Sequence, residues 1–135
     1  MNKEQNIIHI LKRITRDIEF AGKQRLAACI VSGNKILAFG HNKNKTHPLQ
    51  TRFAKNNHAI FLHAEIDVIK NALKDNSSDI LEGTILYIAR TKKNGSEGIA
   101  RPCEGCMRAI EAFGISKVVY TTDIENTYGQ LDRAG

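Results

Sequence analysis

Two short segments of the sequence carry side chains that together can hold a metal ion and move protons. His63 and Glu65 stand two residues apart in His-Ala-Glu, and Cys103 and Cys106 belong to the later segment Pro-Cys-Glu-Gly-Cys. A catalytic zinc ion takes three protein ligands, with nitrogen and sulfur donors favoured, and keeps a fourth position open for water. His63, Cys103 and Cys106 supply these three ligands.

The two cysteines suit a single ion because they stand three residues apart, so on a helix both sulfur atoms reach the same side. Apolar residues recur at helical spacing in 60–73 and in 103–113, which predicts a helix start at each half of the site. Pro102 fits the first position of the second helix. The partial positive charge of two helix N-termini, added to that of zinc, favours thiolates over thiols.

Glu65 has a different task from the ligands. It is too close to His63 in the sequence to be a convenient fourth ligand, but it is well placed to reach a metal-bound water. We therefore interpret it as the general acid and base of a hydrolytic reaction.

Each half of this pattern has simpler explanations when taken alone. A Cys-x-x-Cys segment can be a redox pair or half of a structural zinc site, and a single histidine beside an apolar helix face is usually a core or surface residue. A closed structural site needs a fourth ligand. The remaining cysteine, Cys29, stands in the apolar run 26–31, where a buried small side chain is expected. The two halves in combination favour catalytic zinc.

His-x-Glu followed by Pro-Cys-x-x-Cys is a signature of zinc nucleobase deaminases. On these motifs the chain resembles the cytidine/deoxycytidylate deaminase superfamily over about 26–120, most of its length. The resemblance implies the cytidine-deaminase-like fold, a zinc cofactor and a homo-oligomer. It also implies attack of water at C4 of cytosine to give uracil and ammonia, with Glu65 transferring the protons.

The resemblance also suggests substrate contacts. Asn42 corresponds to the family's asparagine that hydrogen-bonds the sugar, and the backbone N–H of Ala64 would help to hold the base. Arg101 directly precedes Pro102 and can face the substrate. The alternatives are an ordinary asparagine in a turn and a solvated arginine.

Positive charge is concentrated in the first half of the chain. The net charge is +6, and residues up to Ile60 contain eleven Lys or Arg against three Asp or Glu, whereas the remainder contains nine against eleven. Four of the basic residues, Lys43, Lys45, Arg52 and Lys55, lie between Asn42 and His63, and 41–58 contains no acidic residue. This segment predicts an anionic substrate, with Lys43 and Lys45 as phosphate-binding candidates, or it is simply solvated basic surface.

Two substrate classes remain open, together with one reading that is not an enzyme. The segment 107–115 followed by 118–120 looks most like the deoxycytidylate branch, so a free cytosine nucleotide, dCMP, is the predicted substrate. The alternative is deamination of cytosine or adenine in single-stranded DNA or RNA, including a tRNA-type enzyme, although aromatic stacking residues near the basic segment are scarce. A zinc-stabilised binding module without activity would have no use for Glu65.

The element pattern predicts an α/β fold. We expect a single domain, 1–135, built as a three-layer αβα sandwich with a mixed four- to five-stranded sheet. The predicted elements are a helix over 4–21 that ends at Gly22, a strand hairpin of 26–31 and 36–39, a helix over 62–74, a strand over 84–89, a helix over 103–113 that ends at Gly114, and a strand over 116–121 parallel to 84–89. The last fourteen residues suffice for a short edge strand or a turn or two of helix.

One segment departs from the compact members of the family. Residues 91–101 lie between the 84–89 strand and Pro102, where those relatives place Pro-Cys almost at once, and Asn94-Gly95 is the expected turn.

Location follows from what the sequence lacks. No apolar run approaches the roughly 20 residues of a membrane span, and the first residues carry no signal-peptide segment. Three cysteines give no even disulfide framework. We therefore expect a cytoplasmic protein without a membrane partner.

Overall fold

The order of the elements follows the predicted pattern, with additions in the two longest loops. The computed structural model describes residues 2–18, 25–43, 48–53 and 62–132. These form α1 (Lys3–Asp17), β1 (Arg25–Ser32), β2 (Lys35–His41), α2 (Pro48–Phe53), α3 (Ala64–Lys74), a 3-10 turn η1 (Ser78–Leu81), β3 (Ile85–Thr91), β4 (Glu97–Gly98), α4 (Glu104–Ala112), β5 (Lys117–Thr121) and β6 (Tyr128–Asp132).

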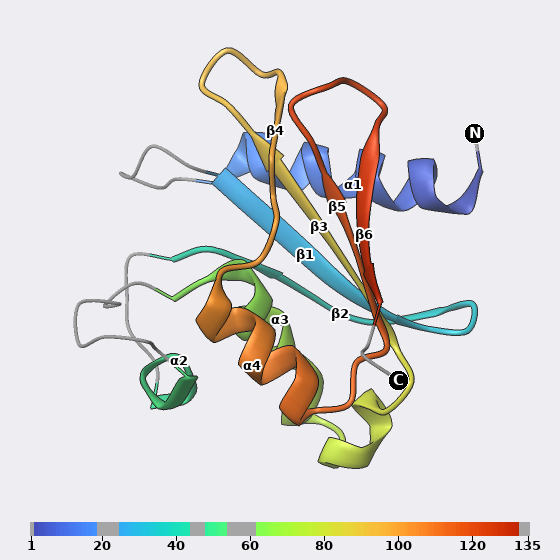
Figure 1. Cartoon of the computed structure of the whole chain (residues 1–135), viewed down its shortest axis with the longest axis vertical. Coiled ribbons are helices and arrows are strands. Elements are labelled where there is room, and N and C mark those ends of the chain that lie inside the picture. Colours follow the sequence, from blue (N-terminus) through green and yellow to red (C-terminus); the bar gives the residue numbers. More distant parts are fainter. Residues whose placement is uncertain (1, 19–24, 44–47, 54–61, 133–135) are drawn as a thin grey trace.

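The strands form one mixed sheet in the order β2-β1-β3-β5-β6, and the short β4 pairs with β3 beside this path (Figure 1). β3 and β5 are parallel, because the chain crosses over through α4 between them, and the other pairs are antiparallel. This confirms the predicted mixed sheet, the hairpin of the first two strands and the parallel pair. β6 is the edge strand that the last fourteen residues allowed for.

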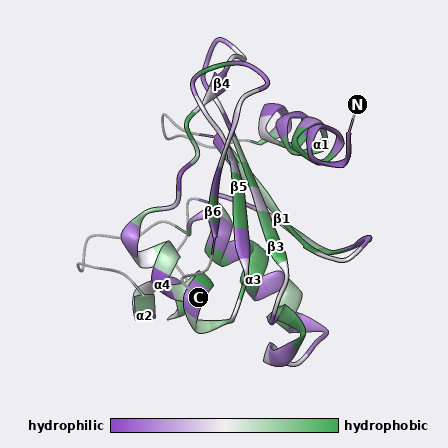
Figure 2. Cartoon of the chain, turned by 45° about the vertical axis from the view of Figure 1, so that its right-hand side comes forward, coloured by the Kyte–Doolittle hydropathy of each residue, from purple (hydrophilic) through white to green (hydrophobic). Residues whose placement is uncertain are grey.

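Helices cover both faces of the sheet, as predicted for an αβα sandwich. Figure 2 shows α1 on one side of the strands and α3 and α4 on the other. The central strands are apolar on both faces, since successive side chains point to opposite sides. On β3, Leu86 and Ile88 pack in the core beneath α3 and α4, whereas Tyr87 and Ala89 pack under α1. Cys29 also lies under α1 and is fully buried, as the apolar run around it predicted.

α1 is shorter than predicted. Asn2 and Gln5 form a reciprocal capping box at its start, and the buried Ile8 and Leu11 face the sheet. The helix ends at Asp17, because Ile18 already has extended backbone angles. The predicted stop at Gly22 lies outside the described residues.

The two longest loops contain elements that periodicity did not predict. The segment between β2 and α3 holds α2, a helix of 6 residues that starts at Pro48. In the 91–101 segment the expected turn is confirmed, with Gly95 at a positive φ of 87°. That turn brings Glu97–Gly98 back to pair with β3 as β4.

α3 lies unusually close to β2. A Cβ atom added to Gly40 would come within 2.4 Å of the backbone nitrogen of Val68, so only glycine fits there. This contact brings the end of β2, with His41 and Asn42, against the first turns of α3. No helix among the described residues is long and apolar enough to cross a membrane.

Candidate metal and catalytic site

α2 holds the backbone at the start of α3. His63 is the N-cap of α3, with φ −77° and ψ 152°, and its backbone N–H donates to the Gln50 Oε1 atom over 3.0 Å. Gln50 is 1% exposed, so this hydrogen bond is shielded from water. Sequence reasoning missed Gln50, because the contact joins a short helix in an unpatterned loop to a residue thirteen positions away.

Cys103 begins α4. It is the N-cap residue, and its Sγ atom accepts a hydrogen bond from the Cys106 backbone N–H at 3.4 Å. The expectation that Pro102 occupies the first helical position is wrong, because the cysteine takes the capping role and Pro102 precedes it. The same sulfur atom therefore fixes the helix start and faces the metal site.

The two helix starts bring the three predicted ligands together. His63, Cys103 and Cys106 each offer one ligand atom, and these atoms all lie within 4.8 Å of one another. The His63 Nδ1 atom lies 3.3 Å from the Cys106 Sγ atom and 3.6 Å from the Cys103 Sγ atom. Zinc bonds to sulfur and nitrogen are about 2.0–2.3 Å long, so one ion fits between atoms at these separations. One nitrogen and two sulfur donors suit zinc.

The thiol of Cys103 is already polarised toward metal binding. Hydrogen bonds from the Cys106 thiol and from His63 lower the pKa of Cys103 to about 4. The hydrogen bond between the two cysteine side chains raises the pKa of Cys106. The hydrogen bond between His63 and Cys103 raises the pKa of His63. Cys103 is therefore a thiolate at neutral pH, which is the form that binds zinc.

Glu65 is the second residue of α3 and lies outside the three-ligand group. Its side chain is buried, with the residue 4% exposed, and burial raises the pKa of its carboxyl group, although the nearby His63 lowers it in part. A buried carboxyl group with a raised pKa is suited to accepting and returning protons near neutral pH. Ala64, at the first position of α3, is also buried and presents its N–H in the turn where a helix has no internal acceptor.

Asp67 joins the end of β2 to α3, and sequence reasoning missed it. Its fully buried carboxylate accepts from the Lys43 Nζ atom at 2.8 and 2.9 Å, from Lys70 at 3.1 Å and from the His41 backbone N–H at 3.0 Å. Burial raises the pKa of Asp67, but these hydrogen bonds outweigh it and the pKa is lowered. The Lys43 ammonium, a predicted phosphate contact, is thus already paired within the protein.

The other predicted substrate residues are placed in different ways. Asn42 is buried, and its Oδ1 atom accepts from the Leu26 backbone N–H at 3.1 Å, so its carboxamide ties the end of β2 to the start of β1. Arg101 is exposed, two residues before Cys103. Lys45 and Lys55 lie outside the described residues. The Arg52 guanidinium lies 5.1 Å from the centre of the Phe53 ring.

Comparisons with solved structures show the same fold. The chain is similar to a cytidine deaminase from Burkholderia pseudomallei, with 15% identity and a TM-score of 0.66 over 98% of this chain and 93% of that one. It is also similar to dCMP deaminase from the cyanophage S-TIM5, in the apo form (22% identity, TM-score 0.53, 89% and 84% of the two chains) and in complex with dCMP and dUMP (21%, 0.53, 89% and 82%).

The family is shown by the sequence itself. No curated protein sequence matches the chain significantly. The family described as cytidine and deoxycytidylate deaminase zinc-binding region, however, matches residues 1–122, which include both helix starts and all three ligands. The chain therefore belongs to the cytidine and deoxycytidylate deaminase family of zinc-dependent hydrolases.

Proposed function

We propose that this protein deaminates the cytosine ring of a free nucleotide, with dCMP as the expected substrate and dUMP and ammonia as products. The observation that carries the proposal is the convergence of His63, Cys103 and Cys106 beside the buried Glu65 at two helix starts. The likeness to a dCMP deaminase and to a cytidine deaminase supports a cytosine substrate.

The proposed roles follow from the placement of each group. His63, Cys103 and Cys106 hold the zinc ion, which when bound makes water a nucleophile at neutral pH. Glu65 takes a proton from the attacking water, gives one to the ring nitrogen N3, and protonates the amine that leaves C4. The Ala64 N–H holds the base, and Asn42 contacts the sugar. The buried position of Glu65 keeps bulk water from competing for its proton.

The basic segment gives less support to a polynucleotide substrate than its composition suggests. The Lys43 ammonium is paired with Asp67, and Lys45 and Lys55 lie outside the described residues. A free nucleotide with a single phosphate is the simpler proposal. A homo-oligomeric state and a cytoplasmic location also stay predictions.

The test is a substrate panel scored by mass spectrometry for replacement of the amine by oxygen. The zinc-loaded protein is incubated with deoxycytidine, dCMP, dCTP, single-stranded DNA, tRNA and free bases. Turnover that is fastest with dCMP supports the proposal. Turnover confined to an oligonucleotide or tRNA overturns the free-nucleotide substrate, and no turnover of any cytosine compound overturns the function.

A further inference from the structure

We propose that Arg90 is a substrate-binding residue of this site and that its guanidinium group binds the phosphate of the nucleotide. The proposal rests on the proposed function and names the group that recognises the phosphate. Neither the zinc motif nor the basic segment pointed to Arg90, which stands near the end of β3.

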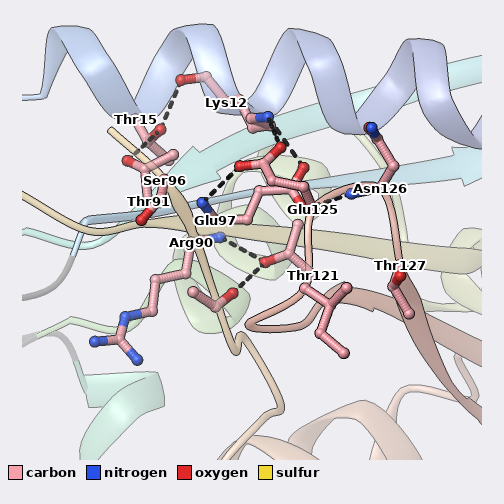
Figure 3. A network of polar contacts seen from close by, with 12 residues as sticks. Lys12, Thr15, Arg90, Thr91, Ser96, Glu97, Thr121, Glu125, Asn126 and Thr127 are labelled. Carbon is pink, nitrogen blue, oxygen red and sulfur yellow. Dashed lines mark hydrogen bonds and ion pairs between the residues drawn. The ribbon is translucent and has the colours of Figure 1, made fainter. Parts of the chain in front are cut away.

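The first observation is the face of the sheet on which Arg90 lies. Side chains alternate along a strand, and Leu86 and Ile88 pack on the side of α3 and α4. Arg90 continues this row, one step beyond the apolar core. Figure 3 shows its side chain leaving the sheet on the side away from α1. The zinc ligands begin α3 and α4, so Arg90 is on the face that carries the site.

The second observation is what lies to either side of Arg90. On one side it pairs with Leu26, whose N–H is bonded to Asn42, the proposed sugar contact. On the other side it pairs with Gly98, from which the chain runs through Arg101 to Cys103. Arg90 is thus flanked by the strand that Asn42 holds and by the segment that leads to a zinc ligand.

The third observation is the lack of a partner for its charge. The Nε atom of Arg90 is buried and has no hydrogen-bond partner, and its Nη1 atom makes one long contact of 3.4 Å to the Ile99 carbonyl oxygen. Within the described residues Arg90 makes no ion pair, whereas Lys43 is paired with Asp67 and Arg108 with Glu104. A buried donor without an acceptor is costly, and an anion bound at this position would remove that cost.

The fourth observation is that the backbone and stem of Arg90 are held in place (Figure 3). The Thr121 Oγ1 atom accepts from the Arg90 N–H at 3.0 Å and donates to the Gly98 carbonyl at 2.7 Å. A Cβ atom added to Gly98 would lie 3.1 Å from the Arg90 Cδ and Nε atoms, so the stem rests against the glycine. The stem of Arg90 is therefore held in place before any ligand binds, which reduces the entropy lost on binding.

The chemistry of the group selects phosphate. The planar guanidinium fork matches a phosphate in a bidentate manner. Neighbouring strands are about 4.8 Å apart, so Arg90 is roughly one strand spacing from the start of β1, where Asn42 is bonded. A nucleotide whose sugar contacts Asn42 can reach Arg90 with the phosphate that extends from that sugar.

The test compares the binding of dUMP and deoxyuridine, which differ only in the phosphate, by calorimetry on the zinc-loaded protein. We expect wild type to prefer dUMP, and Arg90→Gln to lose affinity for dUMP by about ten- to hundredfold while affinity for deoxyuridine changes much less. Arg90→Lys should restore part of the preference. Arg13→Gln, the same change on an exposed position of α1, is the control and should leave the preference unchanged.

Two results would overturn the proposal. The first is that the phosphate adds as much to binding in Arg90→Gln as it does in wild type, so that both proteins prefer dUMP over deoxyuridine to the same extent. The second is that Arg90→Gln loses affinity for dUMP and deoxyuridine equally, which indicates a structural role. If Arg90→Gln does not fold by circular dichroism, Arg90→Lys decides, since a full dUMP preference in it contradicts the need for a bidentate fork. A protein that binds dUMP through Arg90 yet deaminates no cytosine compound would disprove the proposed function and keep this inference.

Discussion

Cys103 combines two tasks that are usually given to different residues. Its sulfur caps α4 by accepting the Cys106 N–H, and it belongs to the three-ligand group with His63. The positive end of the helix and the hydrogen bond from the Cys106 thiol both favour the thiolate, so capping and ligand preparation reinforce each other.

Removing one sulfur ligand should release the metal. We expect Cys106→Ala to bind much less than one zinc per chain and to unfold at a lower temperature, because binding at such sites is coupled to folding. Cys29→Ala is the matched control, since Cys29 is equally buried but lies under α1. Atomic absorption and thermal unfolding measure both effects. Full zinc occupancy in Cys106→Ala would contradict the ligand assignment.

Glu65 should be separable from the metal. We expect Glu65→Gln to keep one zinc per chain and a similar unfolding temperature, because the amide has the same shape and the residue is not a ligand. Its kcat with the best substrate of the panel should fall by about 10²- to 10⁴-fold, since a glutamine cannot transfer protons. Zinc content and kcat are measured on the same preparation. A variant with near wild-type turnover would disprove the proton-transfer role.

At the scale of elements, Asp67 binds the end of β2 to α3. Its carboxylate accepts from the His41 N–H and pairs with both Lys43 and Lys70, so it joins the strand that leads to Asn42 to the helix that begins at His63. Gly40 permits this contact by letting α3 approach the strand closely. Asn42 and the zinc ligand His63 are therefore held in register by Asp67 and Gly40.

We expect Asp67→Asn to lower the free energy of unfolding by about 3 kcal/mol, because it leaves the half-buried ammonium groups of Lys43 and Lys70 without a counter-charge. Asp123→Asn, which alters an exposed pair with Lys92, should cost at most about 0.5 kcal/mol. Denaturant unfolding at pH 7 measures both variants. If Asp67→Asn and Asp123→Asn have equal free energies of unfolding, the Asp67 cluster does not hold β2 to α3.

The comparison of wild type with Asp67→Asn also gives a pH prediction. The folded-state pKa of Asp67 is lowered from 3.8, so its carboxylate contributes stability above the unfolded value and this contribution is lost as the pH falls through the folded pKa. Wild type should therefore lose its advantage over Asp67→Asn in acid below that value. A constant difference between the two proteins across this range would count against the assigned cause.

At the scale of the whole molecule, the 91–101 segment connects the layers on the two faces of the sheet. The buried carboxylate of Glu97 pairs with Lys12 of α1 at 3.0 Å and accepts from the Asn126 N–H at 3.0 Å, before β6. Thr15 and Thr91 add a buried hydroxyl hydrogen bond of 2.9 Å (Figure 3). Beyond Gly98 the same segment runs on to the zinc cysteines, so α1 on the far face helps to position the site.

Glu97→Ala should loosen this connection. We expect a loss of about 2–4 kcal/mol in the free energy of unfolding, because Lys12 and the Asn126 N–H lose a buried acceptor. Hydrogen exchange should become faster across 91–101 but not in the centre of β5. Lys92→Gln, which removes an exposed ion pair from the same loop, is the control. Unchanged exchange in 91–101 would show that α1 does not anchor the segment.

The features determined by the sequence alone are those with a local period or a short motif. The apolar runs of β1 and β3, the helical spacing after His63 and Cys103, and the Asn94-Gly95 turn each depend on neighbours a few residues apart, so the fold class, the ligands and the presence of the two helices follow from them. The tertiary structure decided which polar side chains meet. Asp67 pairs with Lys43, Gln50 holds His63, and Arg90 has no counter-charge among the residues that the structure describes. These outcomes depend on distances between residues far apart in the chain, which no periodic pattern records.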